Sequence, residues 1–218
     1  MFISYNEACA RDCSTLEQDL VLCEKAGFDY IEIRLDMLTD YLKRHTVEEL
    51  AAFFCTSRLK PHAFNALYLY PEFLSEGDDE ARQKELLEEF RLGCEVGRAI
   101  GSHYFIIVPP LQRDPAGGPY TGSWEDTFSN CVRILKDLSR RAEPYDMNLC
   151  FELVGFERSS VRSIGQADAV VRAVDRPNVG FVFDSYNIFL NGGCNDFSPI
   201  GSVQPEKIFA VHLMSADD

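Results

Sequence analysis

The chain has 218 residues, with 21 Lys and Arg against 35 Asp and Glu, so its formal net charge is −14. Its 46% hydrophobic and 12% aromatic residues suffice for a large buried core, and 26% charged residues argue against disorder. This acidity disfavours nucleic acid as a partner, because the protein would repel phosphates. No apolar run reaches the length of about 18 residues that spans a bilayer, so we expect a cytoplasmic protein without a membrane partner.

Short β-branched and aromatic runs alternate with longer runs of helical periodicity along the whole chain. The alternation predicts strands at Met1–Asn6, Tyr30–Arg34, Pro61–Leu67, Tyr104–Val108, Asn148–Val154, Gly180–Asp184 and Ile208–Leu213. It predicts helices at Ser14–Ala26, Thr46–Ser57, Asp79–Ile100, Ser123–Ala142 and Ser163–Val174, and a less regular piece at Pro199–Gln204. The strands recur about every 34 residues, which is typical of βαβ units, and no shift of composition marks a second domain.

Capping sequences support several of these helix boundaries. The segments Thr46–Glu49 and Ser14–Glu17 both have the form of a capping box before an apolar run. Gly27 and Gly101 each follow a predicted helix, at the position where a residue with left-handed backbone commonly ends it.

Eight cysteines lie at irregular spacing along the chain, five of them within the predicted helices and strands. They are Cys9, Cys13, Cys23, Cys55, Cys94, Cys131, Cys150 and Cys194. The sequence has no CxxC pair and its start lacks the basic region of a signal peptide. We therefore expect reduced thiols in the core instead of disulfides or a zinc knuckle.

Seven consecutive parallel strands fit either a doubly wound open sheet or most of an eight-stranded barrel. A doubly wound nucleotide-binding sheet needs a glycine-rich turn after its first strand, and Tyr5–Ala10 contains no glycine. We therefore expect one α/β domain over residues 1–218, a TIM (β/α)8-type barrel. The sequence stops soon after the seventh strand, so this expectation includes a truncation that leaves out strand 8 and helix 8.

Three polar residues at the carboxyl ends of strands are the main candidates for chemistry, since barrel enzymes carry their active sites there. Glu152, Asp184 and His212 interrupt or end the apolar strands five, six and seven. A charge inside a barrel costs on the order of several kcal/mol unless it is paired or binds a metal. We expect the three to bind one divalent ion, Zn²⁺, Mn²⁺, Co²⁺ or Fe²⁺, with Mg²⁺ less suited because it prefers more oxygen ligands. A buried hydrogen-bond network without metal is the alternative.

Further polar residues at strand ends are candidates for contact with a polyol, with a structural salt bridge or loop hydrogen bond as the alternative for each. They are Glu7, Glu32, Arg34, Asn65 and Asn187. His62 and His103 lie at strand starts and His45 at a helix entry, so we expect these three to be structural or solvated. The sequence has neither a GxSxG elbow nor an HExxH motif, which disfavours a serine hydrolase or a metalloprotease.

Segments along nearly the whole chain resemble the sugar-phosphate isomerase/epimerase superfamily, the xylose isomerase-like TIM barrels, and within it the inosose isomerases (2-keto-myo-inositol isomerases) of inositol catabolism. They are Tyr5–Ala8, Leu22–Lys25, Asp29–Arg34, Phe64–Leu67, Phe151–Gly155, Asn178–Gly180 and Phe183–Ser185. Each segment alone is weak, but their order and spacing together are fairly specific.

The resemblance implies a metal held by a glutamate, an aspartate, a histidine and a second glutamate on strands five to eight. Glu152, Asp184 and His212 match the first three, and the fourth has no counterpart here. The family commonly has histidine where this chain has Asn187, and inosose isomerases have another where it has Phe156. These departures bear on the identity of the substrate more than on the fold.

The implied activity is isomerisation of a small neutral keto-polyol of the inosose type, with Glu152 as acid/base and metal ligand. The metal would stabilise the enediolate that forms when the α-proton leaves. Other enzymes of the same barrel are alternatives, namely a keto-sugar epimerase or isomerase or a 3-dehydroshikimate dehydratase. Another alternative is a truncated, non-catalytic remnant that binds metal or polyol, and an incomplete barrel is also expected to form homo-oligomers.

Overall fold

A computed structural model describes residues 2–10, 13–69, 80–112, 118–192 and 196–214. The strands are β1 (Ser4–Asn6), β2 (Tyr30–Arg34), β3 (Lys60–Tyr68), β4 (Tyr104–Val108), β5 (Asn148–Glu152), β6 (Val179–Asp184) and β7 (Ile208–His212). The α-helices are α1 (Leu16–Ala26), α2 (Leu35–Tyr41), α3 (Val47–Thr56), α4 (Glu80–Ile100), α5 (Trp124–Ala142), α6 (Ile164–Val174) and α7 (Ser185–Gly192). Short 3-10 helices are η1 (Glu7–Ala10), η4 (Glu143–Tyr145), η5 (Ser198–Ser202) and η6 (Pro205–Lys207).

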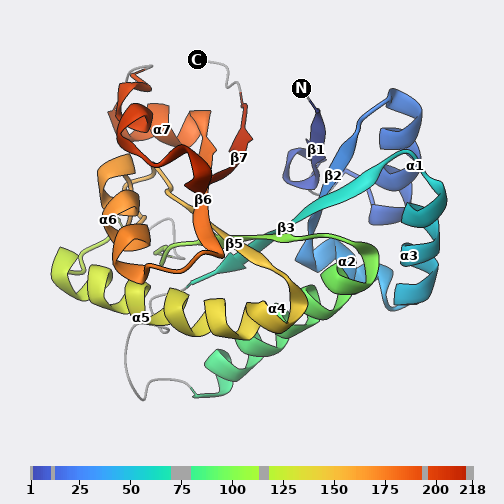
Figure 1. Cartoon of the computed structure of the whole chain (residues 1–218), viewed down its shortest axis with the longest axis horizontal. Helices are drawn as coiled ribbons and strands as arrows, with labels where there is room; N and C mark the ends of the chain where they lie inside the picture. The colour runs from blue at the N-terminus through green and yellow to red at the C-terminus, as the bar shows by residue number, and fades with distance from the viewer. Residues whose placement is uncertain (1, 11–12, 70–79, 113–117, 193–195, 215–218) are drawn as a thin grey trace.

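The strands form one parallel sheet in which each strand pairs with its neighbours in chain order, from β1 to β7. The sheet curves around a central axis and the helices cover its outer side (Figure 1). Within the described residues β1 pairs only with β2 and β7 only with β6, so the sheet is open between these two strands. The α/β barrel-type fold predicted from the sequence is confirmed, as a seven-stranded open barrel.

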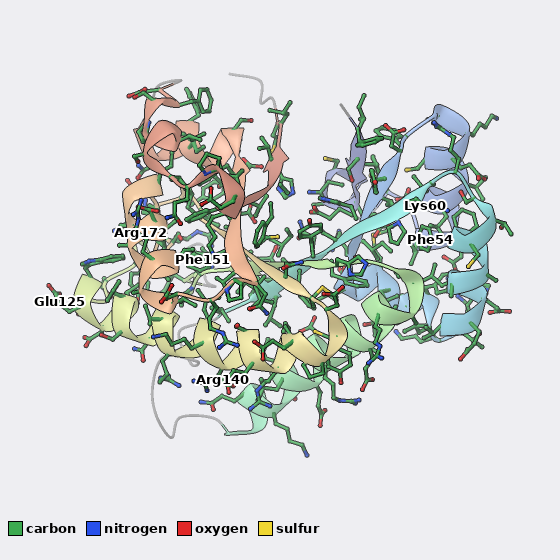
Figure 2. All side chains as sticks on the ribbon, viewed as in Figure 1. Phe54, Lys60, Glu125, Arg140, Phe151 and Arg172 are labelled. Carbon is green, nitrogen blue, oxygen red and sulfur yellow. The ribbon has the colours of Figure 1, made fainter. Side chains whose placement is uncertain are left out.

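The core has two layers because successive side chains of a strand point to opposite faces. Phe105 and Phe151 are fully buried between the sheet and the helices, and Figure 2 shows Phe151 on that side of β5. Ile106, Cys150 and Val182 belong to a smaller cluster on the inner face of the curved sheet. The sheet therefore presents its inner face to a central space, and residues in phase with Cys150 and Val182 point into it.

Most predicted helix boundaries lie within two residues of the observed ones, and the capping box at Thr46 is present. Thr46 N donates to Glu49 Oε2 at 2.8 Å, and Thr46 Oγ1 accepts from Glu49 N at 3.2 Å. The predicted box at Ser14–Glu17 is wrong by one residue, because Thr15 precedes α1 and its backbone N–H donates to Gln18 Oε1.

Two helices were not predicted, and both follow a strand without a connecting loop. Helix α2 begins at Leu35 directly after β2, and α7 begins at Ser185 directly after β6. Neither start has the capping-box pattern, a Ser, Thr, Asn or Asp followed three residues later by Glu or Gln, that supports the predicted starts of α1 and α3. The predicted fifth strand also ends early, at Glu152 instead of Val154.

The seven cysteines among the described residues are all free thiols, as predicted. Cys23, Cys94, Cys131 and Cys150 are buried, and burial raises the pKa of Cys131 to about 12, so this thiol stays neutral. The expectation of core positions is wrong for the remaining three, Cys9, Cys13 and Cys55, which are exposed; Cys194 lies outside the described residues. No helix in the described part of the chain is long and apolar enough to cross a membrane.

Candidate metal centre

Glu152, Asp184 and His212 are the last residues of β5, β6 and β7. Two positions earlier on these strands lie Cys150, Val182 and Ala210, which belong to or pack against the inner cluster. Because side chains alternate along a strand, the side chains of all three candidate residues also point into the central space. Because the strands are parallel, their carboxyl ends lie at the same end of the barrel. Strand alternation and parallel pairing together bring the three side chains to one place.

The three side chains offer donor atoms that all lie within 4.8 Å of one another. His212 Nδ1 is 3.7 Å from Glu152 Oε1 and 4.0 Å from Asp184 Oδ2. Glu152 and Asp184 are each 7% exposed, and His212 is partly buried. The arrangement is a compact set of two carboxylates and one imidazole at the edge of solvent.

The electrostatics of this group depend on His212. Burial alone would lower the pKa of His212, but the carboxylates of Glu32 and Glu152 outweigh burial and raise it to about 11. Burial raises the pKa of Glu152, and the charge of the neighbouring His212 opposes that effect only in part. The carboxylates of Glu32, Glu152 and Asp184 are crowded around this one imidazole, and a divalent ion is stabilising in such surroundings.

Asn187, in the first turn of α7, connects two of the candidate ligands. Its backbone N–H donates to Asp184 Oδ1 at 2.8 Å. Its amide Nδ2 donates to Glu152 Oε1 at 3.4 Å, and its Oδ1 accepts from Gly155 N at 3.2 Å. The start of α7 therefore limits the positions of both carboxylates.

Glu32 on β2 faces the same space from the opposite side of His212. Its Oε2 lies 3.0 Å from His212 Nε2, and its Oε1 accepts from Asn65 Nδ2 at 2.7 Å. Burial would raise the pKa of Glu32, but the neighbouring His212 and Asn65 outweigh it, and the pKa lies below its ordinary value. Glu32 is therefore a buried, ionised carboxylate with a partner on each oxygen.

A cavity of about 1310 Å³ occupies the inner side of the sheet and reaches its open edge between β1 and β7. Glu152, Asp184 and His212 line it, together with three of the five residues that were predicted to contact a polyol: Glu32, Asn65 and Asn187. The cavity is large enough for a six-carbon polyol, given that small-molecule sites measure roughly 300 to 1,000 Å³.

Glu7 and Arg34, the other two residues predicted to contact a polyol, do not line the cavity. Glu7 begins η1, is fully buried, and accepts a hydrogen bond from Arg34 N at 2.8 Å. Arg34 pairs with Asp36 in the first turn of α2. Both residues lie at the end of a strand, as predicted. Their side chains, however, contact neighbouring residues instead of facing the cavity.

His62 lines the cavity, although its position at a strand start predicted a structural or solvated side chain. It lies near the start of β3 and is packed between the rings of Tyr30 and Tyr104. Its Nδ1 is buried without a hydrogen-bond partner and lies 3.9 Å from Glu32 Oε2. The cavity extends toward the amino ends of the strands, so a position at a strand start did not exclude contact with it.

His45 lies outside the cavity, as expected, whereas His103 also lines it. His45 stacks on Tyr41, with ring centroids 4.4 Å apart, and its imidazole lies 3.4 Å from carboxylate oxygens of Glu17 and Glu49. His103 is exposed beside Asp146.

The donor set fits a divalent transition metal. Two ligands at about 2.0 to 2.2 Å from zinc, at a tetrahedral angle, are roughly 3.4 Å apart. The distances of 3.7 and 4.0 Å from His212 Nδ1 to the two carboxylate oxygens are only slightly wider. Three protein ligands with an open position are typical of catalytic rather than structural zinc sites.

Comparison with known proteins identifies the family. Residues 20–218 match the family described as xylose isomerase-like TIM barrel. The chain belongs to this family. It is 35% identical over 219 residues to an inosose isomerase of Halalkalibacterium halodurans and 34% identical to one of Bacillus subtilis, and covers 73% and 74% of their lengths.

The structural comparisons agree. A crystal structure of IOLI protein with a binding zinc atom is 35% identical, with a TM-score of 0.88 over the whole chain and 74% of that protein. D-psicose 3-epimerase, in a structure determined in the presence of D-fructose, has a TM-score of 0.73 at 15% identity over 98% of this chain and 73% of that one. The second likeness shows the shared fold alone.

Proposed function

We propose that this protein is a divalent-metal-dependent isomerase of a cyclic keto-polyol of the inosose type. The observation that carries the proposal is the convergence of Glu152, Asp184 and His212 in a cavity large enough for such a ligand. The identity of about 35% to inosose isomerases, and the zinc atom of a relative with the same identity, support it.

The proposed metal ligands are Glu152, Asp184 and His212, with zinc, manganese or cobalt as the ion. When bound, the metal supplies a positive charge that stabilises negative charge developing on the substrate carbonyl oxygen. Asp184 and His212 hold the ion in place. Glu152 is also the acid/base that takes the proton from the carbon next to the carbonyl, since a carboxylate with a raised pKa is better matched to this step.

The amides of Asn65 and Asn187 lie in the same cavity and are the proposed contacts for substrate hydroxyls. The cavity also favours a neutral substrate over a phosphorylated one. Among its described lining residues Lys60 is the single Lys or Arg, and its Nζ donates to the carbonyls of Phe54 and Ser57 at 2.6 and 2.8 Å. A phosphate group would therefore meet three carboxylates, from Glu32, Glu152 and Asp184, without a free Lys or Arg among the described lining residues.

The experiment is a proton-exchange assay in D₂O with the zinc- or manganese-loaded protein. Enediolate formation transfers the α-proton of a bound ketose to the base, the base exchanges it with D₂O, and reprotonation returns deuterium to the carbon. Mass spectrometry therefore detects the first step even where net turnover is slow. We expect deuterium uptake into an inosose, and none with Glu152→Gln loaded with the same metal.

The substrate panel separates the related activities. Free and phosphorylated ketoses, a ketohexose substrate for 3-epimerisation and 3-dehydroshikimate are assayed with the same protein. Exchange restricted to a ketohexose or to a phosphorylated sugar, or dehydration of 3-dehydroshikimate, contradicts the inosose assignment. Metal and polyol binding without any exchange identifies a non-catalytic binding protein.

A further inference from the structure

The imidazole of His212 is held between two different sets of carboxylates. On one side, Nε2 lies 3.0 Å from Glu32 Oε2. On the other side, Nδ1 lies 3.7 Å from Glu152 Oε1 and 4.0 Å from Asp184 Oδ2. The first distance is that of a hydrogen bond, whereas the other two are too long for one and leave space for an ion between the atoms.

Glu32 is itself held in a fixed orientation. It lies within β2, is 2% exposed, and its second oxygen accepts from Asn65 Nδ2 on the neighbouring strand β3 at 2.7 Å. Residues Arg34 and Asn65 are paired in register between the two strands, so the backbone ladder sets the spacing of Glu32 and Asn65. His62 Nδ1 is 3.9 Å from Glu32 Oε2, which is beyond hydrogen-bond distance.

A neutral imidazole has one N–H and one lone pair, and the partner of one nitrogen decides which nitrogen is free to bind a metal. Nε2–H donating to Glu32 leaves the lone pair on Nδ1, which faces Glu152 and Asp184. We infer that Glu32 is a positioning residue for the metal centre: it fixes His212 in the tautomer that binds metal through Nδ1, and Asn65 fixes Glu32. This inference rests on the proposed function, because it presupposes the metal at Glu152, Asp184 and His212.

The same geometry distinguishes a positioning role of Glu32 from two other roles of a carboxylate in the cavity, binding the metal and binding a substrate hydroxyl. The two nitrogens lie on different sides of the imidazole ring, so a group bound at Nε2 is directed away from a metal at Nδ1. Glu32 is accordingly not a member of the three-residue cluster whose donor atoms lie within 4.8 Å. With one oxygen on His212 and the other on Asn65, Glu32 supports the imidazole instead of binding the ion or a substrate hydroxyl.

The test compares the wild type with Glu32→Gln and Glu32→Ala. Glu7→Gln is the matched control, because Glu7 is also a buried glutamate beside β2 but does not line the cavity. Circular dichroism and thermal melting establish that each variant is folded. Zinc affinity is measured by competition with a chromophoric chelator, and the tautomer of His212 by ¹⁵N–¹H NMR of histidine-labelled, zinc-loaded protein.

We expect the wild type to show a protonated Nε2 and a zinc-bound Nδ1. Zinc affinity should fall about 10- to 100-fold in Glu32→Ala and by at least about 10-fold in Glu32→Gln, as for other partners of metal-bound histidines, and stay within twofold in Glu7→Gln. If Glu32→Ala does not fold, Glu32→Gln and the wild-type spectrum decide the question.

Two results overturn the inference while leaving the proposed metal centre intact. One is zinc bound through Nε2 of His212, and the other is a folded Glu32→Gln protein with wild-type zinc affinity. A wild-type protein that binds no zinc overturns the proposed function together with this inference.

Discussion

Glu32 lies on β2 and Glu7 lies beside the end of that strand, yet their surroundings give the two carboxyls opposite properties. Glu32 has His212 and Asn65 as partners and is ionised, whereas Glu7 has one backbone N–H as a partner and an Oε1 without any. Burial is the largest influence on Glu7, and with the nearby charge of Asp19 it raises the pKa to about 8, from an ordinary value of 4.5. A buried glutamate here is thus neutral or charged according to its partners.

The state of Glu7 predicts a pH dependence of stability. Between pH 4.5 and about 8 the unfolded chain has lost this proton while the folded protein retains it, so the free energy of unfolding falls as pH rises. The loss is on the order of a few kcal/mol and is complete above pH 8. Glu7→Gln does not titrate, so its stability relative to the wild type should increase from pH 5 to pH 8.5 in urea unfolding. A constant difference between the two proteins across this range contradicts the assignment.

The residues of the candidate site were predictable from the sequence where a charge interrupts an apolar strand. Glu152 and Asp184 stand out because Leu149–Phe151 and Val179–Phe183 are almost wholly apolar. Glu7 and Arg34 share the strand-end position, but the sequence does not reveal that each side chain is occupied by a local contact. The sequence also does not reveal that His62 lines the cavity, because this depends on how far the cavity extends along the strands.

At the scale of elements, the packing of α7 against the loop after β5 positions two of the candidate metal ligands, Glu152 and Asp184. An added Cβ at Gly155 would lie 2.1 Å from the carbonyl oxygen of Asn187 and 2.7 Å from Leu190 Cβ. This close approach lets Asn187 reach Glu152 and Asp184 from the first turn of α7. Asp184 precedes α7 and accepts from Asn187 N, but it also ends the apolar strand β6, so the sequence did not distinguish a helix start from a strand end and this contact was not predicted.

Gly155→Ala should therefore displace α7, with a loss of about 1 to 3 kcal/mol of stability and weaker metal binding. Gly165→Ala is the control, because an added Cβ there meets nothing within 4 Å and a helical Ala is favoured over Gly by up to about 1 kcal/mol. Urea unfolding and zinc titration of both variants are the measurements. Wild-type stability and zinc affinity in Gly155→Ala contradict this role of the contact.

At the scale of the whole molecule, the sheet has two outer strands with apolar side chains in solvent. Val211 and Leu213 at β7 are 59% and 85% exposed, and Phe2 and Ile3 before β1 are 77% and 55% exposed. The barrel-type fold and most element boundaries were predictable, because hydrophobic periodicity is strong and local. The exposure of β1 and β7 could be predicted only from the number of strands, which is one fewer than a closed eight-stranded barrel has. The sequences of these two strands do not differ in pattern from those of the inner strands.

Unpaired edges with apolar side chains promote association between chains. We predict that the 218-residue chain self-associates with rising concentration, and that Val211→Lys/Leu213→Lys reduces this association. The control is Val21→Lys/Leu22→Lys on α1, which removes the same two side-chain types, 61% and 56% exposed, from the outer helical layer. Sedimentation velocity over a concentration series measures the self-association of the wild type and of both double variants. A wild-type chain that stays monomeric, or an equal effect of both double variants, contradicts the role of the edges.

The central claim is that Glu152, Asp184 and His212 form one metal-binding site. It is tested most directly by elemental analysis of the protein after loading with zinc and removal of excess metal. We predict about one zinc per chain in the wild type and in Glu7→Gln, and little zinc in His212→Ala and Asp184→Asn. Equal metal content in the wild type and in both site variants would contradict the account.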